Sequence, residues 1–144
     1  MIDELFQFVT KPSRYLGNEV NSIHKNLTQV ELRFALIFPD LYEVGMSHLG
    51  LQILYHILNE RPNIAAERAY HPGPDMEGML RDRNIPLFSH ESRMPLKEFD
   101  ILGITLPSEL NYTSALNILK LSQVPLLSEQ RNELHPLVIA GGVC

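Results

Sequence analysis

The chain has 144 residues, of which 44% are hydrophobic and 20% are charged, and its formal net charge at pH 7 is −5. A chain of this length fits one domain that buries about two-thirds of its unfolded surface, and its hydrophobic content excludes a disordered tail. The acidic balance argues against a nucleic-acid-binding platform, one cysteine excludes an internal disulfide framework, and no apolar run approaches the ~20 residues of a membrane span. We therefore expect a cytoplasmic domain that contacts neither membrane nor nucleic acid.

The first thirty residues differ in character from the rest of the chain. Asp3 to Val9 predicts a short amphipathic helix with its apolar side chains turned inward. The following stretch, Lys11 to Glu19, is polar and is interrupted by proline and glycine, which is typical of a loop. We expect residues 1–30 to form an N-terminal helix and polar leader, and residues 31–144 to form an α/β domain.

From residue 31 onward, apolar strands alternate with amphipathic helices. Strands are predicted over Leu32–Phe38, Ile64–Tyr70, Ile101–Leu106 and Leu137–Ala140, with a short one at Pro86–Ser89, and helices over Met46–Leu58, Met76–Arg83 (with Asp75 as N-cap) and Tyr112–Leu121. This alternation implies right-handed crossovers and a Rossmann-like (flavodoxin-like) α/β fold, with a mostly parallel sheet of four or five strands and helices on both faces. The nearly unbroken apolar run of the first strand predicts a central position, and the last strand is expected to be buried.

Ligand sites in such folds lie beyond the carboxyl ends of the strands, where the strand order reverses. The loops at these ends are polar, and the glycine pair after the last strand has the composition of a loop that lets backbone approach a ligand or partner closely. We predict a polar crevice formed by Asp40, Tyr42, Glu43, Ser47, Thr105, Ser108, Glu109, Asn111, Gly141 and Gly142.

Each of these loops also has a purely structural interpretation. Asp40 and Glu43 would repel a phosphate, so they either cap the following helix or accept hydrogen bonds from an uncharged polar ligand. The hydroxyl-rich and amide-rich loop from Thr105 to Ser114 either caps the next helix or serves a ligand or a domain interface. A loop that ends in Gly141-Gly142, close to the end of the sequence, leads us to expect that the chain is one part of a longer protein.

Residues that could form a catalytic or metal centre are scattered. His48, His71, His90 and His135 stand apart in the sequence, and no Ser-His-Asp or Cys-His grouping is present. Cys144 is terminal and isolated. We therefore expect that this chain alone holds no catalytic residues and no metal site.

Several segments together resemble a known group of proteins. These are the leader Lys11–Glu19, the stretch Phe38–Ser47, Leu49-Gly50-Leu51 at the start of a leucine-rich helix, Phe99–Thr105, and Val138–Gly142. In order and spacing, residues 30–144 resemble the N-terminal cobalamin-binding-type domain of radical S-adenosylmethionine (radical SAM) enzymes, in an uncharacterised branch of that group.

The resemblance implies that the catalytic machinery lies downstream. In that family the next segment carries a three-cysteine motif that binds a 4Fe-4S cluster, which in turn binds S-adenosylmethionine, and Cys144 is too isolated to replace it. The expected function is thus an accessory domain that offers a cofactor-type crevice or a docking face to the downstream catalytic domain of the same protein. The alternative is a free-standing flavodoxin-like module for small-molecule binding or signalling.

One feature of the resemblance concerns the cofactor. The methionine-synthase type of cobalamin domain supplies an axial histidine from an Asp-x-His-x-x-Gly motif. Here Tyr42 stands two positions after Asp40, and His48 is displaced from that place by six residues. If cobalamin binds, the resemblance implies that it does so without an axial histidine from this loop.

Overall fold

A computed structural model of the chain describes residues 2–143, and within them four strands form one parallel sheet in the order β2-β1-β3-β4. The strands are β1 (Leu32–Phe38), β2 (Ile64–Tyr70), β3 (Ile101–Leu106) and β4 (Leu137–Gly142), and the α-helices are α1 (Tyr42–Gly45), α2 (Leu49–Glu60), α3 (Pro74–Asp82) and α4 (Tyr112–Leu121). The predicted parallel α/β fold is confirmed, and β1 is an interior strand between β2 and β3, as its apolar sequence indicates.

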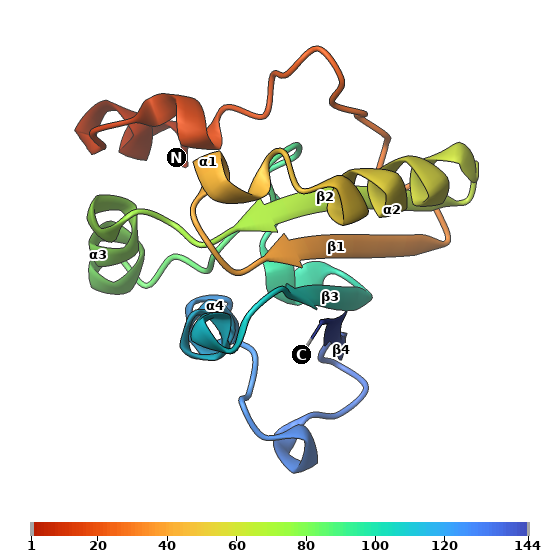
Figure 1. The fold of residues 1–144 in the computed structure, drawn as a ribbon. Coiled ribbons are helices and arrows are strands. Elements are labelled where there is room, and N and C mark those ends of the chain that lie inside the picture. The colour runs from red at the N-terminus through yellow and green to blue at the C-terminus, as the bar shows by residue number, and fades with distance from the viewer. Residues whose placement is uncertain (1, 144) are drawn as a thin grey trace.

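Helices lie on both faces of the sheet, as predicted. On one face, Leu51 and Tyr55 of α2 pack against Ala66 and Tyr70 of β2. On the other face, α3 and α4 pack against the alternate side chains of the same strands (Figure 1). No helix between residues 2 and 143 is long and apolar enough to cross a membrane.

The N-terminal leader packs as part of the same unit. Residues Asp3–Phe8 form a 3-10 helix, and Leu5, Phe6 and Val9 are buried in the core on the α3–α4 face, which confirms that these side chains point inward. Farther along, the backbone N–H of Ile23 donates to the hydroxyl of Tyr55 at 2.7 Å. The leader therefore wraps from one face of the sheet to the other around the β2 edge.

Two further contacts fix the ends of this wrapped segment. The Tyr15 hydroxyl accepts a hydrogen bond from the backbone N–H of Gly73 at 2.9 Å. The Lys25 ammonium donates to the carbonyls of Asn59 and Arg61 at the end of α2, at 2.7 and 2.8 Å, where the helix has no N–H partners of its own. It also donates to the carbonyl of Ile64 at the start of β2, at 2.6 Å. Figure 1 shows the leader and β4 at opposite edges of the sheet.

The last strand differs from its prediction in two ways. It was expected to be buried, but Leu137 and Ile139 are 60% and 45% exposed, because β4 is the edge strand and α2 lies over β1 and β2 only. The glycine pair was expected to form a loop, but it belongs to β4, where Gly141 pairs with Thr105 and Gly142 with Leu106. A Cβ at Gly142 would lie 2.3 Å from the Leu106 carbonyl oxygen, so this pairing requires glycine.

The predicted helix boundaries also need correction. The helix predicted over Met46–Leu58 begins later, as α2 at Leu49, and ends at Glu60, and the short helix α1 before it was not predicted. His48 is the N-cap of α2 through its Nδ1, which accepts from Leu51 N–H at 3.2 Å. Asp75 does not cap α3, since Gly73 holds that position. The Asp75 carboxylate instead accepts from the Thr10 backbone N–H at 2.7 Å and so holds the leader. The short strand expected at Pro86–Ser89 is reduced to one antiparallel bridge, Phe88 with Pro95.

A pair of glycine substitutions tests the path of the leader. Gly17 has φ +66° and a Cβ there would meet the His90 carbonyl oxygen at 2.0 Å, so Gly17→Ala should lower the free energy of unfolding by about 2 kcal/mol or more. Gly78 lies within α3 with nothing within 4 Å of its Cβ position, and Gly78→Ala should raise the free energy of unfolding by about 0.5–1 kcal/mol. Urea unfolding of both variants measures the two values, and equal effects would contradict the leader's close approach to His90.

Candidate functional site

An apolar groove lies beside α2, on the same face of the sheet as that helix, over β1, β3 and β4. Its volume is about 560 Å³. It is lined by Phe34 and Leu36 of β1, by His48, Gly50, Ile53 and Leu54 at the start of α2, by Gly103, Ile104 and Thr105 of β3, and by Ile139, Ala140, Gly141 and Gly142 of β4.

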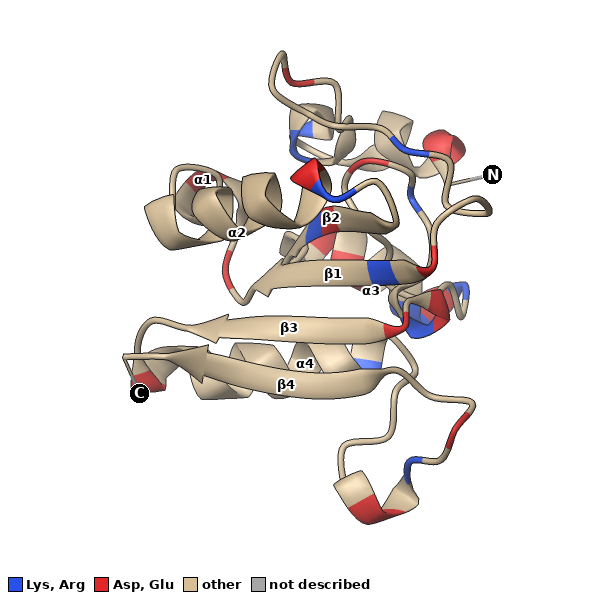
Figure 2. Cartoon of the chain, turned by 90° about the vertical axis from the view of Figure 1, so that its right-hand side faces the viewer, with Lys and Arg blue, Asp and Glu red and all other residues tan. Residues whose placement is uncertain are grey.

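The groove is open because one half of the sheet face has no helix over it. Strand register puts Phe34, Ile101 and Leu137 on the same face as α2, which covers only the β1–β2 half. In Figure 2, α4 lies behind β3 and β4, and no described segment lies in front of them. Parallel sheets are normally buried on both faces, so an uncovered half is unusual. Along the same groove, Ile53 and Leu54 of α2 are 48% and 49% exposed.

The groove adjoins the point where the strand order reverses. The crossover through α2 leads from β1 to β2, whereas the crossovers through α3 and α4 lead in the other direction to β3 and β4, so the reversal falls between β1 and β3. The side-chain amide of Asn111 donates to the Pro39 carbonyl at 3.2 Å and ties the two loops together at this point. Ligands of open α/β sheets bind at such a position.

The residues of the predicted crevice fall into separate groups. Thr105, Gly141 and Gly142 line the groove. Tyr42 and Glu43 turn away from it toward the leader, where Glu43 pairs with Arg14 at 2.8 Å. The others lie near the loops: Asp40 accepts from Leu41 N–H at 2.7 Å, Ser108 accepts from Leu110 N–H at 3.2 Å, Asn111 bonds to Pro39, and Ser47 and Glu109 are exposed.

The structural interpretation of the two carboxylates differs from what the sequence indicated. Helix α1 has no side-chain cap, so neither Asp40 nor Glu43 caps it. Glu43 instead holds the leader through Arg14 and through Lys11 at 3.3 Å. Neither carboxylate lines the groove.

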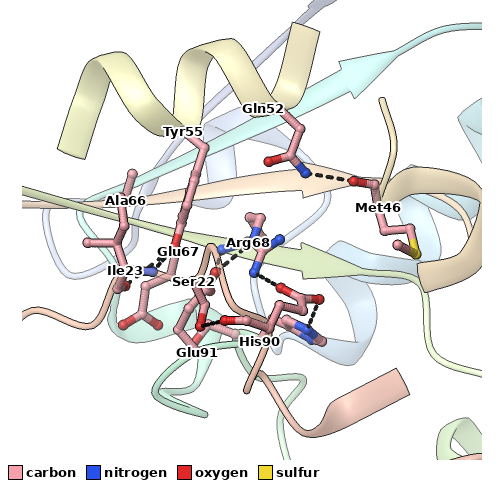
Figure 3. Close-up of polar contacts among 12 residues, drawn as sticks. Ser22, Ile23, Met46, Gln52, Tyr55, Ala66, Glu67, Arg68, His90 and Glu91 are labelled. Atoms are coloured by element: carbon pink, nitrogen blue, oxygen red, sulfur yellow. Dashed lines mark hydrogen bonds and ion pairs between the residues drawn. The ribbon is translucent and has the colours of Figure 1, made fainter. Parts of the chain in front are cut away.

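A cluster of charged and polar side chains, which the sequence analysis did not predict, is centred on Arg68 of β2 (Figure 3). The guanidinium is almost fully buried and donates to the Glu91 carboxylate at 2.6 Å, and it lies 4.8 Å from the centre of the Tyr55 ring. The Arg68 backbone N–H donates to the same Glu91 side chain at 2.7 Å. The sequence signal was the pair of charges, Glu67 and Arg68, in the middle of a predicted strand, since such charges must be paired when buried.

Glu19 of the leader completes this cluster. Its carboxylate accepts hydrogen bonds from the Tyr42 hydroxyl, from Arg68 Nη2 and from His90 Nε2, the last at 3.0 Å. Burial raises the pKa of Glu19, but the hydrogen bonds from His90, Tyr42 and Arg68 outweigh it and bring the pKa to about 2. Burial and the bond to Glu19 raise the pKa of Tyr42 to about 12, so its hydroxyl remains a donor.

Residues 50–144 match the family described as radical SAM proteins, N-terminal. The chain belongs to this family. A curated relative, an uncharacterised protein of Methanocaldococcus jannaschii, is 26% identical over 110 residues, which are 76% of this chain and 19% of that protein. The chain thus spans about a fifth of the length of this relative. No solved structure matches the chain.

Side chains that could bind a metal lie apart in the described part of this radical SAM N-terminal domain. Among residues 2–143, no group of three or more His, Cys, Asp or Glu side chains could hold a metal ion. Cys144 lies outside the described residues. The candidate functional regions of the described chain are therefore the apolar groove and the Arg68 cluster.

The Glu19 contacts predict how stability depends on pH. Because the folded-state pKa of about 2 lies below the ordinary value of 4.5, the Glu19 carboxylate stabilises the fold above pH 4.5, and this contribution declines as the pH falls toward 2. The wild type should therefore exceed Glu19→Gln in stability near neutral pH, and the difference should shrink in acid. Urea unfolding between pH 2.5 and 7 measures this, with the exposed Glu133→Gln as control, and a difference independent of pH would contradict the assignment.

Proposed function

We propose that this domain is an accessory module of a radical SAM enzyme and that its apolar groove holds a segment of the same protein located beyond residue 143. The catalytic chemistry would then belong to a downstream domain with the 4Fe-4S cluster and S-adenosylmethionine. The observation that carries the proposal is the uncovered half of the parallel sheet. Membership of a family described by an N-terminal position, and a relative about five times as long as the matched region, support the existence of such a segment.

The distribution of charge supports the same role for the groove. Charged side chains concentrate on the leader, the loops and the helix ends, whereas β3 and β4 carry none along their length (Figure 2). Exposed apolar surface that is contiguous is typical of a protein interface. The opposite edge of the sheet, at β2, is already closed by the leader and by the His90 N–H, which donates to the Arg68 carbonyl at 2.7 Å. The groove and the β4 edge are therefore where the rest of the protein would pack.

Charge substitutions in the groove test this proposal. In the full-length protein, Ile53→Glu and Ile139→Glu should separate the domain from its partner segment, because a carboxylate buried at an apolar contact is costly. Hydrogen exchange should then become faster in α2, β3 and β4, with circular dichroism of the 144-residue chain unchanged. Leu134→Glu is the matched control, since Leu134 is 88% exposed and lies outside the groove. Unaltered exchange in both groove variants would refute docking at this surface.

A flat cofactor is the second candidate occupant, and the glycine end of β4 favours it. No atom lies within 4 Å of a Cβ placed at Gly141, so the groove ends on a stretch of backbone without side chains. This surface adjoins the reversal of strand order, where cofactors bind in related folds. Cobalamin, if it is the occupant, would supply its cobalt chemistry to the downstream domain.

The two side chains of the segment after β1 that could ligate a metal, Tyr42 and His48, are both engaged elsewhere. His48 accepts from Leu51 N–H through Nδ1, so its neutral ring carries the proton on Nε2 and has no free lone pair for a metal. The Tyr42 hydroxyl donates to Glu19. Coordination by His48 through Nε2 would require the proton to move to Nδ1 and would remove the cap of α2. Cobalamin would therefore bind without an axial ligand from this loop.

Titration with hydroxocobalamin separates these candidates. If the groove binds the cofactor, the visible spectrum should change equally in the wild type and in His48→Ala. A change that disappears in His48→Ala would show that His48 coordinates cobalt, contrary to the role of its Nδ1 as a cap. Absence of binding to the 144-residue chain and to the full-length protein would exclude the cofactor and leave docking as the function of the groove.

A further inference from the structure

A polar cavity of about 310 Å³ lies on the far side of α2 from the groove, between the leader, α1 and α2. Its walls include the side chains of Asn21, Gln52 and His56, and its floor includes Tyr42 and Arg68. This volume is at the lower end of the range for small-molecule sites, about 300–1,000 Å³. Unlike the groove, it is lined by groups that donate and accept hydrogen bonds.

Three donors converge on the Glu19 carboxylate, which lines this cavity, and each is also held by contacts that do not involve Glu19. Arg68 is fixed by Glu91 and by the Tyr55 ring. The His90 backbone bonds to β2, and its ring stacks on Tyr42 with the ring centres 5.0 Å apart. The Arg68 guanidinium, the His90 imidazole and the Tyr42 hydroxyl therefore form a preorganised set of donors.

The carboxylate that accepts from these donors, that of Glu19, comes from a segment of the leader without helix or strand structure. Glu19 lies in neither a helix nor a strand, its side chain is 28% exposed, and the adjacent Val20 is fully exposed. Tyr15 and Lys25 anchor the chain on either side of it. Residues 18–22 form a strap between these anchors, and a local shift of the strap would leave both anchors in place.

The cluster also has an unused polar group. Among the described residues, the Tyr70 hydroxyl is buried and has no hydrogen-bond partner, and the residue is only 7% exposed. The Tyr70 ring meets Tyr42 edge-on, with ring centres 5.2 Å apart, and lies 5.5 Å from His90. Buried hydroxyls normally have a partner, so this orphan is consistent with a cluster that can accept another polar group.

We propose that Tyr42, Arg68 and His90 form a binding site for a small carboxylate ligand, and that Glu19 of the strap fills this site in the free chain. A ligand entering the cavity would replace the Glu19 carboxylate on the same donors, and the strap would move aside. Glu91 already neutralises Arg68, so the site suits one singly charged carboxylate better than a phosphate dianion. The site is separate from the groove and does not depend on the function proposed for it.

Removal of Glu19 followed by addition of a small carboxylate tests the site. Glu19→Ala in the 144-residue chain should lower Tm by about 3–6 °C, because three donors lose their acceptor. Sodium formate should restore at least half of this loss, and sodium chloride at equal ionic strength should not. In the wild type, where Glu19 fills the site, formate should shift Tm no more than chloride does.

Two further variants show whether the rescue is specific. Glu133→Ala removes an exposed carboxylate and should respond equally to formate and chloride. Adding His90→Ala to Glu19→Ala should abolish the response to formate, because one of the donors is gone. If Glu19→Ala does not fold in chloride, refolding it in formate makes the same comparison. The proposal is overturned if formate and chloride act alike on Glu19→Ala, or if the double variant is rescued as well.

Discussion

The structure depends on the burial of a charge at Arg68 in the edge strand β2. A guanidinium can be buried only if a carboxylate is fixed against it, and breaking a buried pair of this kind costs about 3–5 kcal/mol. Glu91 fulfils this requirement and also accepts from the Arg68 backbone N–H, so the same side chain closes the outer edge of β2. Glu19 of the leader also bonds to Arg68, and His90, next to Glu91, bonds to Glu19 and stacks on Tyr42, so the leader and the aromatic rings are joined to this buried pair.

The two edges of the sheet differ in whether other segments cover them. At β2, the leader and the segment at His90 cover the exposed backbone, which is how proteins protect an edge from unwanted pairing. At β4, the described chain offers an apolar strand with no cover on the α2 face and no neighbour on its outer edge. Within the described residues, the β2 edge is covered and the β4 edge is open to further packing. This asymmetry agrees with membership of the radical SAM N-terminal family.

Helix α2 separates the two candidate sites and contributes to both. One flank, with Ile53 and Leu54, borders the apolar groove, and the other, with Gln52 and His56, borders the polar cavity. His48 begins the helix and Lys25 closes its end, so the ends of α2 are held by side chains rather than by solvent.

Local patterns in the amino-acid sequence were enough to predict the strands and helices. Runs such as Leu32–Phe38 and Ile101–Leu106 have both the length and the apolar content of buried strands, and their bounds agree with the structure. Their alternation with helices required a parallel sheet, because crossover connections allow little else. The inward side chains of the N-terminal helix followed from the spacing of Leu5, Phe6 and Val9 in the same way.

Which surfaces are covered, and which polar groups meet, depends on how the elements pack together. The sequence of β4 is that of a buried strand, yet its exposure depends on whether another element lies over it, and no local pattern contains that information. Tyr42 and Glu43 were predicted in a strand-end loop beside Thr105, but they lie in α1 and bond to the leader, whereas Thr105 lines the groove. Glu19, Arg68 and His90 are up to 71 residues apart in the chain, and their contact results from the wrapping of the leader around the sheet.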